Sequence, residues 1–325
     1  MEYLQLMGAY VLRRLLINLL VFALITVAIF MLVHAAPGDP VKMMIPPDQL
    51  NSGSAAFIAA KRHELGLDQS VFLQYWHWLD NAVHGNLGYS LVSGRSVTSL
   101  LSERIGPTIE LMGVGLALSL LIAFPLGIIA AVRRNTAVDY TATVVSLGSV
   151  SIPAFFLALL AIYVLTLRFQ LLPSAGMSTP GASGLIDLLR HLLLPALILG
   201  FGNSGPFMRY IRSSMISELG SDYVRTAEAK GAGPIRVVVR HTLRNALIPV
   251  LTIIALSLPG VLAGAVVIEK VFAWPGMGQL AVSSVQQQDY SVIIGFALII
   301  AILVLLSNLV ADLLYTVADP RVRLR

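Results

Sequence analysis

The chain has no cysteine and few charged residues. Without cysteine it cannot form disulfide bonds, thiolate metal sites or a cysteine nucleophile. Only 12% of its 325 residues are charged, against about 25% in an average soluble domain. By contrast, 57% of the residues are hydrophobic and the mean hydropathy is +0.82. So few charges cannot cover a water-exposed surface, and the composition therefore predicts an all-α integral membrane protein.

Several nucleotide and metal signatures are also missing. No Gly-x-x-x-x-Gly-Lys-Ser/Thr occurs, so the chain has no phosphate-cradling P-loop. A spacing that resembles part of a dinucleotide-binding motif occurs at Gly276, Gly278 and Ala281. No predicted strand precedes these residues, so the motif is set aside. The histidines show no metal-ligand spacing. We therefore expect no cofactor and no metal bound by this chain. The net charge of +5 suggests basic cytoplasmic loops rather than nucleic acid.

Six long intervals lack any charged residue. About 20 apolar residues are needed to cross the hydrocarbon core as a helix, and each interval is close to or above that length. The intervals cover residues 15–33, 111–132, 140–167, 191–208, 245–268 and 290–311. We predict six transmembrane helices. A cleaved secretory signal is the alternative for the first interval, which follows Arg13 and Arg14, but that interval is long for a signal and no soluble domain follows it.

The distribution of basic residues predicts the orientation. If the N-terminus is cytoplasmic, 14 of the 22 lysines and arginines lie on the cytoplasmic side. Five of the other eight lie in one long external segment, and long segments weigh little in the positive-inside rule. Both termini are therefore expected in the cytoplasm. The predicted organisation is a first helix with its cytoplasmic start (1–33), a small external cap segment (34–106), a five-helix core (107–316) and a cytoplasmic tail (317–325).

The cytoplasmic loop at 209–246, here called the coupling loop, contains a short helix with defined ends. Ser221 is a good N-cap residue, and Asp222 and Lys230 suit the two ends of the helix dipole. Gly231 can adopt the left-handed conformation that ends a helix. Pro234 can start a second helix, in which Arg236, Arg240 and Arg244 form a basic stripe that could meet lipid phosphates. Such a short helix is marginal alone, and either the chain's own helix ends or a cytosolic partner could hold it.

At this loop the sequence resembles a known family. Residues 222–231 and 240–249 are similar to the EAA loop of ABC importer permeases, and specifically to the peptide and nickel permease family. Further segments match the family in order: 37–40, 85–90, 103–111, 274–280 and 318–321. The long external segment is typical of the first of the two permeases in an oligopeptide or dipeptide system. One departure is Arg225, which stands where the general EAA pattern has glutamate.

The resemblance implies a type I ABC importer permease fold and a coupling helix that docks on a cytosolic ATPase. Ala227 and Ala229 would allow close approach to that partner, and Gly231 a sharp exit. The implied contact residues are Asp222, Tyr223, Val224, Arg225, Thr226, Ala227, Glu228, Ala229, Lys230 and Gly231. Candidates to line the translocation path are Asn203, Ser204, Asn308 and Asp312, for which helix–helix hydrogen bonds are the alternative.

The same resemblance implies partners. These are a second homologous permease, two cytosolic ABC ATPases or one fused heterodimer that bind ATP and Mg, an extracytoplasmic solute-binding protein, a peptide substrate and membrane lipid. The location would be the cytoplasmic (inner) membrane of a bacterium, crossed several times. This chain would be a transport subunit and not itself an enzyme.

Other functions remain open at the level of sequence. Nickel-chelate and glutathione importers share these motifs. A secondary transporter driven by an ion gradient is a rival, although charge-free span centres disfavour coupling through carboxylates. An intramembrane enzyme would need a catalytic group at depth, and His191 is the only histidine near a span and has no evident sequence partner.

Overall fold

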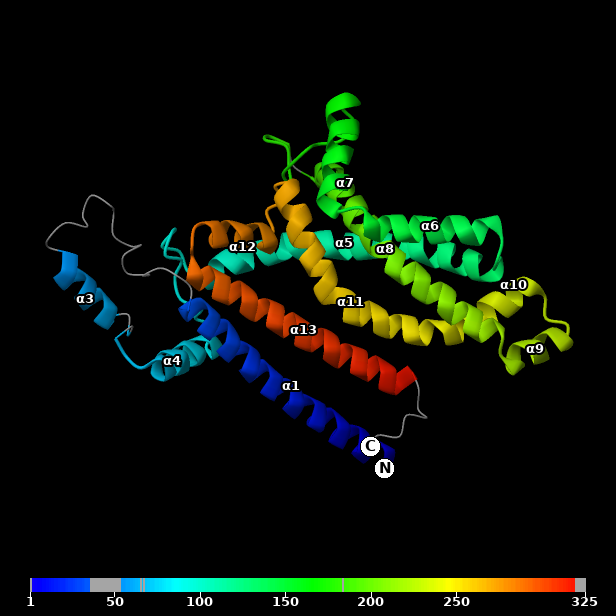
Figure 1. Cartoon of the computed structure of the whole chain (residues 1–325), viewed down its shortest axis with the longest axis horizontal. Coiled ribbons are helices and arrows are strands. Elements are labelled where there is room, and N and C mark those ends of the chain that lie inside the picture. The colour runs from blue at the N-terminus through cyan, green and yellow to red at the C-terminus, as the bar shows by residue number, and fades with distance from the viewer. Residues whose placement is uncertain (1, 36–53, 65, 67, 183, 319–325) are drawn as a thin grey trace. The chain divides into compact units, whose positions relative to one another are not determined.

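The computed structural model describes residues 2–35, 54–64, 66, 68–182 and 184–318, and within these residues it contains helices and no β-strand (Figure 1). The chain forms two compact units. One comprises residues 1–14, 107–279 and 303–325, and the other comprises residues 15–106 and 280–302. The family segment at 37–40 and most of the tail at 317–325 lie outside the described residues.

In the described part of the chain, four helices are each long and apolar enough to cross a membrane, and a bent helix pair could form a fifth span. The four lie within α5 (Val97–Val132), α8 (Leu185–Leu219), α11 (Leu243–Val271) and α13 (Tyr290–Ala318). A shorter apolar stretch, Leu16–Leu32, lies within α1 (Glu2–His34). Large apolar side chains such as Leu20, 63% exposed, and Leu121, 69% exposed, have no protein cover, as expected of surfaces that face lipid. The count of six spans and the cytoplasmic placement of both termini stay predictions.

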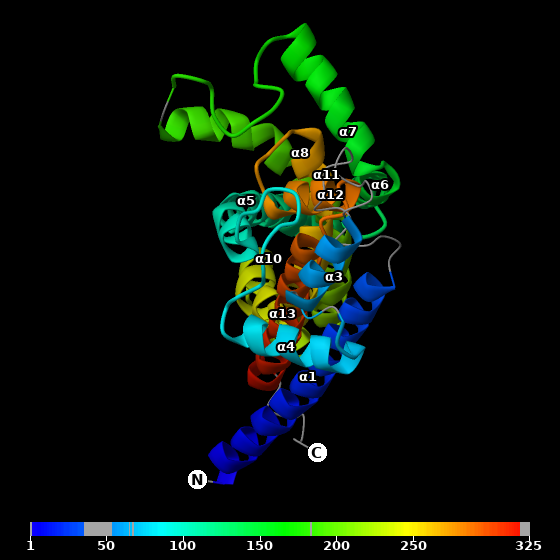
Figure 2. The same ribbon diagram turned by 90° about the vertical axis from the view of Figure 1, so that its left-hand side faces the viewer.

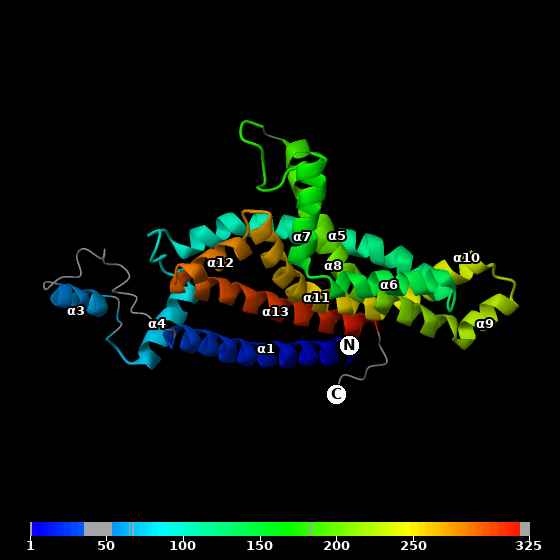
Figure 3. The same cartoon turned by 45° about the horizontal axis from the view of Figure 1, so that its top comes forward.

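The predicted third span is broken in the middle. The chain forms α6 (Ala137–Ser151) and then α7 (Ala154–Ala161), which continues as the wider helical turns of η2 (Ile162–Arg168). The two parts are bent by 97° (Figures 2 and 3). The cause is Pro153, which has no N–H to donate. It also forces Ile152 into an extended conformation, with ψ of 121°.

The core of the first unit is built around α8, which packs against α11 and α6. Leu194, Ile268 and Trp274 belong to one buried cluster, and Phe207 and Met215 belong to a second. Helices α8 and α6 approach each other closely at Gly205. A Cβ atom there would lie 2.4 Å from the carbonyl oxygen of Ser146 on α6, so only glycine allows this approach.

A buried ion pair also joins α6 to α8. Arg212 donates to both carboxylate oxygens of Asp139, at 2.6 and 2.7 Å. The backbone N–H of Asn135 donates to the same carboxylate at 3.0 Å. The Asp139 side chain is only 4% exposed, so removal of Arg212 would leave a buried charge without its main partner. The pair therefore fixes the start of α6 against the last third of α8.

The second unit contains α3 (Ser54–Glu64), α4 (Val71–Val83) and the C-terminal part of α1 from residue 15 onward. Tyr75 of α4 is hydrogen-bonded to Thr26 of α1 at 2.9 Å, and its ring lies edge-on to Phe30. In the same unit, Ser90 donates a buried hydrogen bond to the carboxylate of Asp289. These contacts tie the predicted external cap segment to neighbouring helices of its own unit.

Candidate functional site

The short helix predicted within the coupling loop is present as α9 (Asp222–Ala229). It follows the end of α8 and precedes the one-turn helix α10 (Pro234–Arg236), which Pro234 starts as predicted. Wider helical turns, η3 (Val237–Thr242), then lead into α11. Figures 1 and 3 show α9 where the chain turns back between α8 and α10. The coupling loop thus presents one short helix between two long apolar ones.

The predicted role of Ser221 at the start of α9 was wrong. Ser221 occupies the N-cap position with extended backbone angles, but its side chain makes no capping hydrogen bond. Its hydroxyl instead donates to the carbonyl oxygen of Glu218 at 2.6 Å. This carbonyl belongs to the last turn of α8, where carbonyl oxygens lack helical partners. Ser221 therefore stabilises the end of the preceding helix.

The predicted end of α9 is confirmed. Gly231 has a φ of +81°, a left-handed conformation that side-chain-bearing residues rarely adopt. Its N–H donates to the Glu228 carbonyl at 2.9 Å, and the N–H of Ala232 donates to the Ala227 carbonyl at 3.1 Å. The chain therefore leaves the helix abruptly after Lys230.

Most of α9 is open to solvent. Val224 is 1% exposed and is its one buried residue. Asp222 and Arg225 form an ion pair at 3.7 Å, but both side chains are exposed, so the pair contributes little. Tyr223 donates to the Glu218 carboxylate, and partial burial, reinforced by this bond, raises the pKa of the phenol. A helix anchored by one residue, with its other side chains outward, can dock into a partner's groove.

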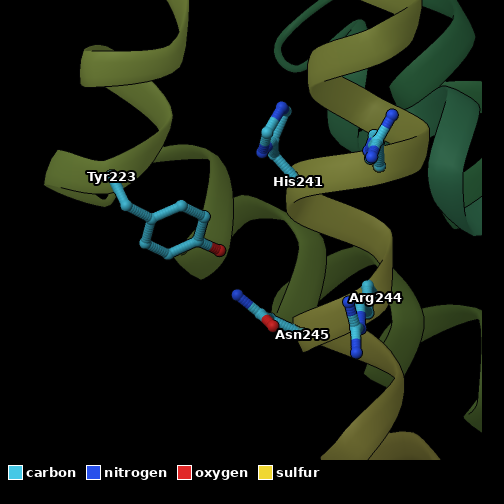
Figure 4. Close-up of a pocket in the computed structure, with 5 residues that line it drawn as sticks. Tyr223, His241, Arg244 and Asn245 are labelled. Atoms are coloured by element: carbon cyan, nitrogen blue, oxygen red, sulfur yellow. The ribbon is translucent and has the colours of Figure 1, made fainter.

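A hollow of about 490 Å³ lies beside α9. We call it the basic hollow, and it is lined by Tyr223, Arg240, His241, Arg244 and Asn245. Figure 4 shows the Tyr223 hydroxyl directed toward Asn245, with His241 and Arg244 on the neighbouring helix. Of the predicted basic stripe, Arg240 and Arg244 line the hollow and Arg236 does not. The sequence did not reveal the hollow, because it depends on how α9 folds back toward the start of α11.

The four candidate path residues lie on two helices. Asn203 and Ser204 on α8 donate to carbonyl oxygens of their own helix, those of Leu199 and Phe201, at 2.8 and 2.7 Å. On α13, Asn308 is exposed and Asp312 forms an ion pair with Arg14 at 3.1 Å. The hydrogen bonds of Asn203 and Ser204 thus stay within α8. The role of the four residues in translocation stays a prediction.

Sequence reasoning missed a buried polar cluster at the end of α11. Glu269 has no exposed surface. Its carboxylate accepts hydrogen bonds from the Thr108 hydroxyl at 2.7 Å and the Gln279 N–H at 3.0 Å. Thr108 in turn accepts from the N–H of Met277 at 2.8 Å. We call these four residues the Glu269 cluster. Its signal in the sequence was a carboxylate directly after a charge-free run, followed by Gly276 and Gly278.

The Glu269 cluster is closed by tight backbone packing. The indole N–H of Trp274 donates to the Pro107 carbonyl at 2.8 Å, and the Trp274 N–H donates to the Glu269 carbonyl at 2.9 Å. A Cβ atom at Gly276 would lie 2.2 Å from the Glu269 carboxyl carbon. Three segments are therefore locked together around one carboxylate: α5 at Pro107 and Thr108, the end of α11, and the turn before α12 (Met277–Gln286).

Among the described residues, no three His, Asp or Glu side chains are grouped so that they could hold a metal ion. His191 does have a partner: its Nδ1 lies 2.9 Å from the Asp187 carbonyl oxygen. Since both residues are on α8, this bond stabilises one turn of that helix.

The helical fold is that of an ABC transporter permease. The solved structure of the MetNI methionine ABC transporter in inward facing conformations matches 68% of this chain and 96% of that chain, with a TM-score of 0.53 and 17% identity. At that identity the likeness shows the fold alone.

The sequence comparisons then give the family. Residues 123–324 match the family described as "Binding-protein-dependent transport system inner membrane component", and residues 7–112 match the N-terminal family of the same membrane components. The chain belongs to this family of inner-membrane permeases, and it is a multi-pass protein of the bacterial inner membrane.

Individual relatives match almost end to end. A Brucella suis biovar 1 (strain 1330) protein with a provisional peptide permease name is 47% identical over 97% of this chain and 98% of its own length. The oligopeptide transport system permease protein AppB of Bacillus subtilis (strain 168) is 39% identical over 97% and 99%. The glutathione transport system permease protein GsiC of Escherichia coli (strain K12) is 38% identical over 97% and 98%.

Proposed function

We propose that this chain forms half of the translocation pathway of an ATP-driven importer for short peptides, and that α9 is the element through which ATP hydrolysis acts on it. The observation that carries the proposal is the exposure of α9. A helix of eight residues that buries only Val224 has little stability of its own. The groove of a cytosolic partner would supply the missing burial.

The expected partners follow from this role. The chain has no P-loop, so two cytosolic ABC ATPases, or one fused heterodimer, would bind ATP and Mg. One permease would supply one half of the pore, so a second homologous permease would supply the other. A solute-binding protein outside the cell would deliver the peptide. The division into first helix (1–33), external segment (34–106), core (107–316) and tail (317–325) belongs to the same proposal.

Peptides are proposed as the substrate class because of the relatives. The oligopeptide and glutathione permeases align over nearly the whole chain, and glutathione is itself a short peptide. A nickel chelate is the alternative that transport measurements would test. Binding of a labelled peptide to the complete transporter, with a nickel chelate as competitor, would separate the two.

Co-purification tests the coupling role. The tagged chain is extracted gently and its partners are identified by mass spectrometry, beside a variant in which Ala227 and Gly231 are replaced by bulky residues. We expect ATPases and a second permease with the natural chain, and selective loss of the ATPases in the variant. As the matched control, Ser213→Trp changes an exposed residue of α8 and should retain every partner. A chain that purifies alone, yet transports, would contradict the proposal.

A further inference from the structure

The basic hollow has a composition that suits an anion. Two guanidinium groups, an imidazole, a phenol and an amide line it, and no carboxylate is among its lining residues. The carboxylate of Glu218 accepts a hydrogen bond from the hydroxyl of Tyr223, one of the lining residues. Within the part of the chain that the structure describes, neither Arg240 nor Arg244 forms an ion pair. Their charges are therefore available to a ligand from outside the chain.

The position of the hollow along α11 indicates where that ligand comes from. The apolar part of α11 that can span a membrane begins at Pro249. Arg244 lies five residues earlier, about 7 Å along the helix axis. The polar headgroup layer on each side of the hydrocarbon core is about 5–7 Å thick. Arg244 and Asn245 therefore lie at the depth of lipid phosphates when α11 spans the membrane.

Apolar side chains beside the hollow support the same environment. Ile235 is 79% exposed and Val239 is 57% exposed, although both belong to the short segment that also carries Arg236 and Arg240. In water these side chains would be uncovered, and a ligand that carries apolar groups beside its charge would cover them. The exposed apolar residues thus favour lipid over a soluble anion.

We propose that the basic hollow binds the phosphate of an anionic phospholipid. Arg240 and Arg244 supply the charge, and His241 and Asn245 supply further polar contacts. Basic pockets next to membrane helices bind anionic headgroups in this way. The placement on the cytoplasmic leaflet rests on the proposed function, because it follows from assigning the coupling loop to the cytoplasm. A lipid held here would link α9 to the start of α11.

The test measures lipid retention by the purified full-length chain. The chain in neutral detergent is titrated with phosphatidylglycerol or phosphatidylcholine, and bound lipid is counted by native mass spectrometry. We expect preferential retention of phosphatidylglycerol. The double variant R240Q/R244Q should lower that affinity by about tenfold or more, since each basic residue at the surface contributes substantially to anionic lipid binding. The matched control R133Q/R134Q, which removes two exposed arginines from another loop, should retain it.

Other outcomes would overturn the proposal. Equal phosphatidylglycerol binding by R240Q/R244Q and the natural chain would show that the hollow is not the site. Displacement of the lipid by millimolar inorganic phosphate would make free phosphate the ligand. Unchanged lipid binding with loss of co-purified ATPases would assign the hollow to the partner.

Two further measurements keep the test decisive. If the double variant does not fold, as judged by gel filtration and thermal unfolding, the single variants R240Q and R244Q are measured, and each should weaken lipid binding. Because lipid retention is measured on the chain alone, it can succeed even when the ATPase co-purification fails, so the two proposals can fail separately.

Discussion

Helix α11 has very different surroundings at its two ends. Near its C-terminal end, the Glu269 cluster surrounds a carboxylate with no exposed surface by hydrogen bonds from Thr108 and the Gln279 N–H. At its N-terminal end, the chain arrives from a loop whose helix α9 buries only Val224. The first end is fixed by the chain itself. Before the N-terminal end, α9 and the basic hollow keep polar and charged groups exposed to other molecules. The proposed coupling role requires such exposure.

The difference teaches where stability and function lie in this protein. A buried carboxylate is tolerated only when hydrogen bonds compensate its lost hydration, so the Glu269 cluster must hold one geometry. An exposed short helix gains little from its own fold and can therefore gain from a partner. Substitutions at the two ends should consequently affect different measurements.

The largest effect is expected at Glu269. Replacing Glu269 by alanine leaves the Gln279 N–H and the Thr108 hydroxyl without their acceptor, and each buried orphan costs about 1–3 kcal/mol. The thermal unfolding temperature of the detergent-solubilised chain should fall markedly. Glu110→Ala removes a carboxylate that is exposed on α5 and should leave it almost unchanged. Equal unfolding temperatures for the two variants would contradict the buried role of Glu269.

The next effect is expected at Gly276. A methyl group there would lie 2.2 Å from the Glu269 carboxyl carbon, so Gly276→Ala must displace the cluster, at a cost of about 1–3 kcal/mol. The control is Gly260→Ala, because a Cβ atom at Gly260 meets nothing within 4 Å. Gly276→Ala should lower the unfolding temperature, whereas Gly260→Ala should not. A Gly276 variant as stable as the natural chain would show that the turn can relax freely.

Substitution of Gly231 should lower stability less than substitution of Gly276, but it should clearly reduce ATP hydrolysis by the assembled transporter. Its φ of +81° would strain an alanine by about 1–2 kcal/mol, and the end of α9 would shift. Peptide-stimulated ATP hydrolysis by the assembled transporter should fall severalfold. The control is Gly220→Ala, which lies before the other end of α9 and has a φ of −80°. This variant should keep the natural rate of ATP hydrolysis. Full activity in the Gly231 variant would separate the helix end from coupling.

The smallest effect is expected at Ser221. If its hydroxyl capped α9, Ser221→Ala would cost about 1 kcal/mol of helix stability. Because the hydroxyl instead donates to the Glu218 carbonyl, the helicity and exchange rates of α9 should hardly change. Amide hydrogen exchange of residues 223–229 measures this directly. Clearly faster exchange in the Ser221→Ala variant would show that the Ser221 side chain does stabilise the start of α9.

The sequence allowed the membrane class, the apolar helices and the bounds of α9 to be predicted, because these depend on local composition and on residues with strong positional preferences, such as Gly231 and Pro234. It did not reveal the bend at Pro153, since a proline within an apolar run is compatible with either a kink or a break. The Glu269 cluster was missed because Thr108 and Glu269 are 161 positions apart. The N-cap position of Ser221 was predictable, but the direction of its hydroxyl was not, because the hydroxyl donates to the Glu218 carbonyl of the preceding helix.

The most direct test of the account compares amide exchange in α9, which precedes α11 in the chain, with amide exchange in the turn that follows α11. Hydrogen exchange is measured by mass spectrometry on the chain alone and on the complete transporter. We predict that residues 222–231 exchange rapidly in the free chain and at least about tenfold more slowly with the ATPases bound, while residues 274–279 are protected in both states. If α9 exchanges at the same rate with and without the ATPases, it is not the coupling helix.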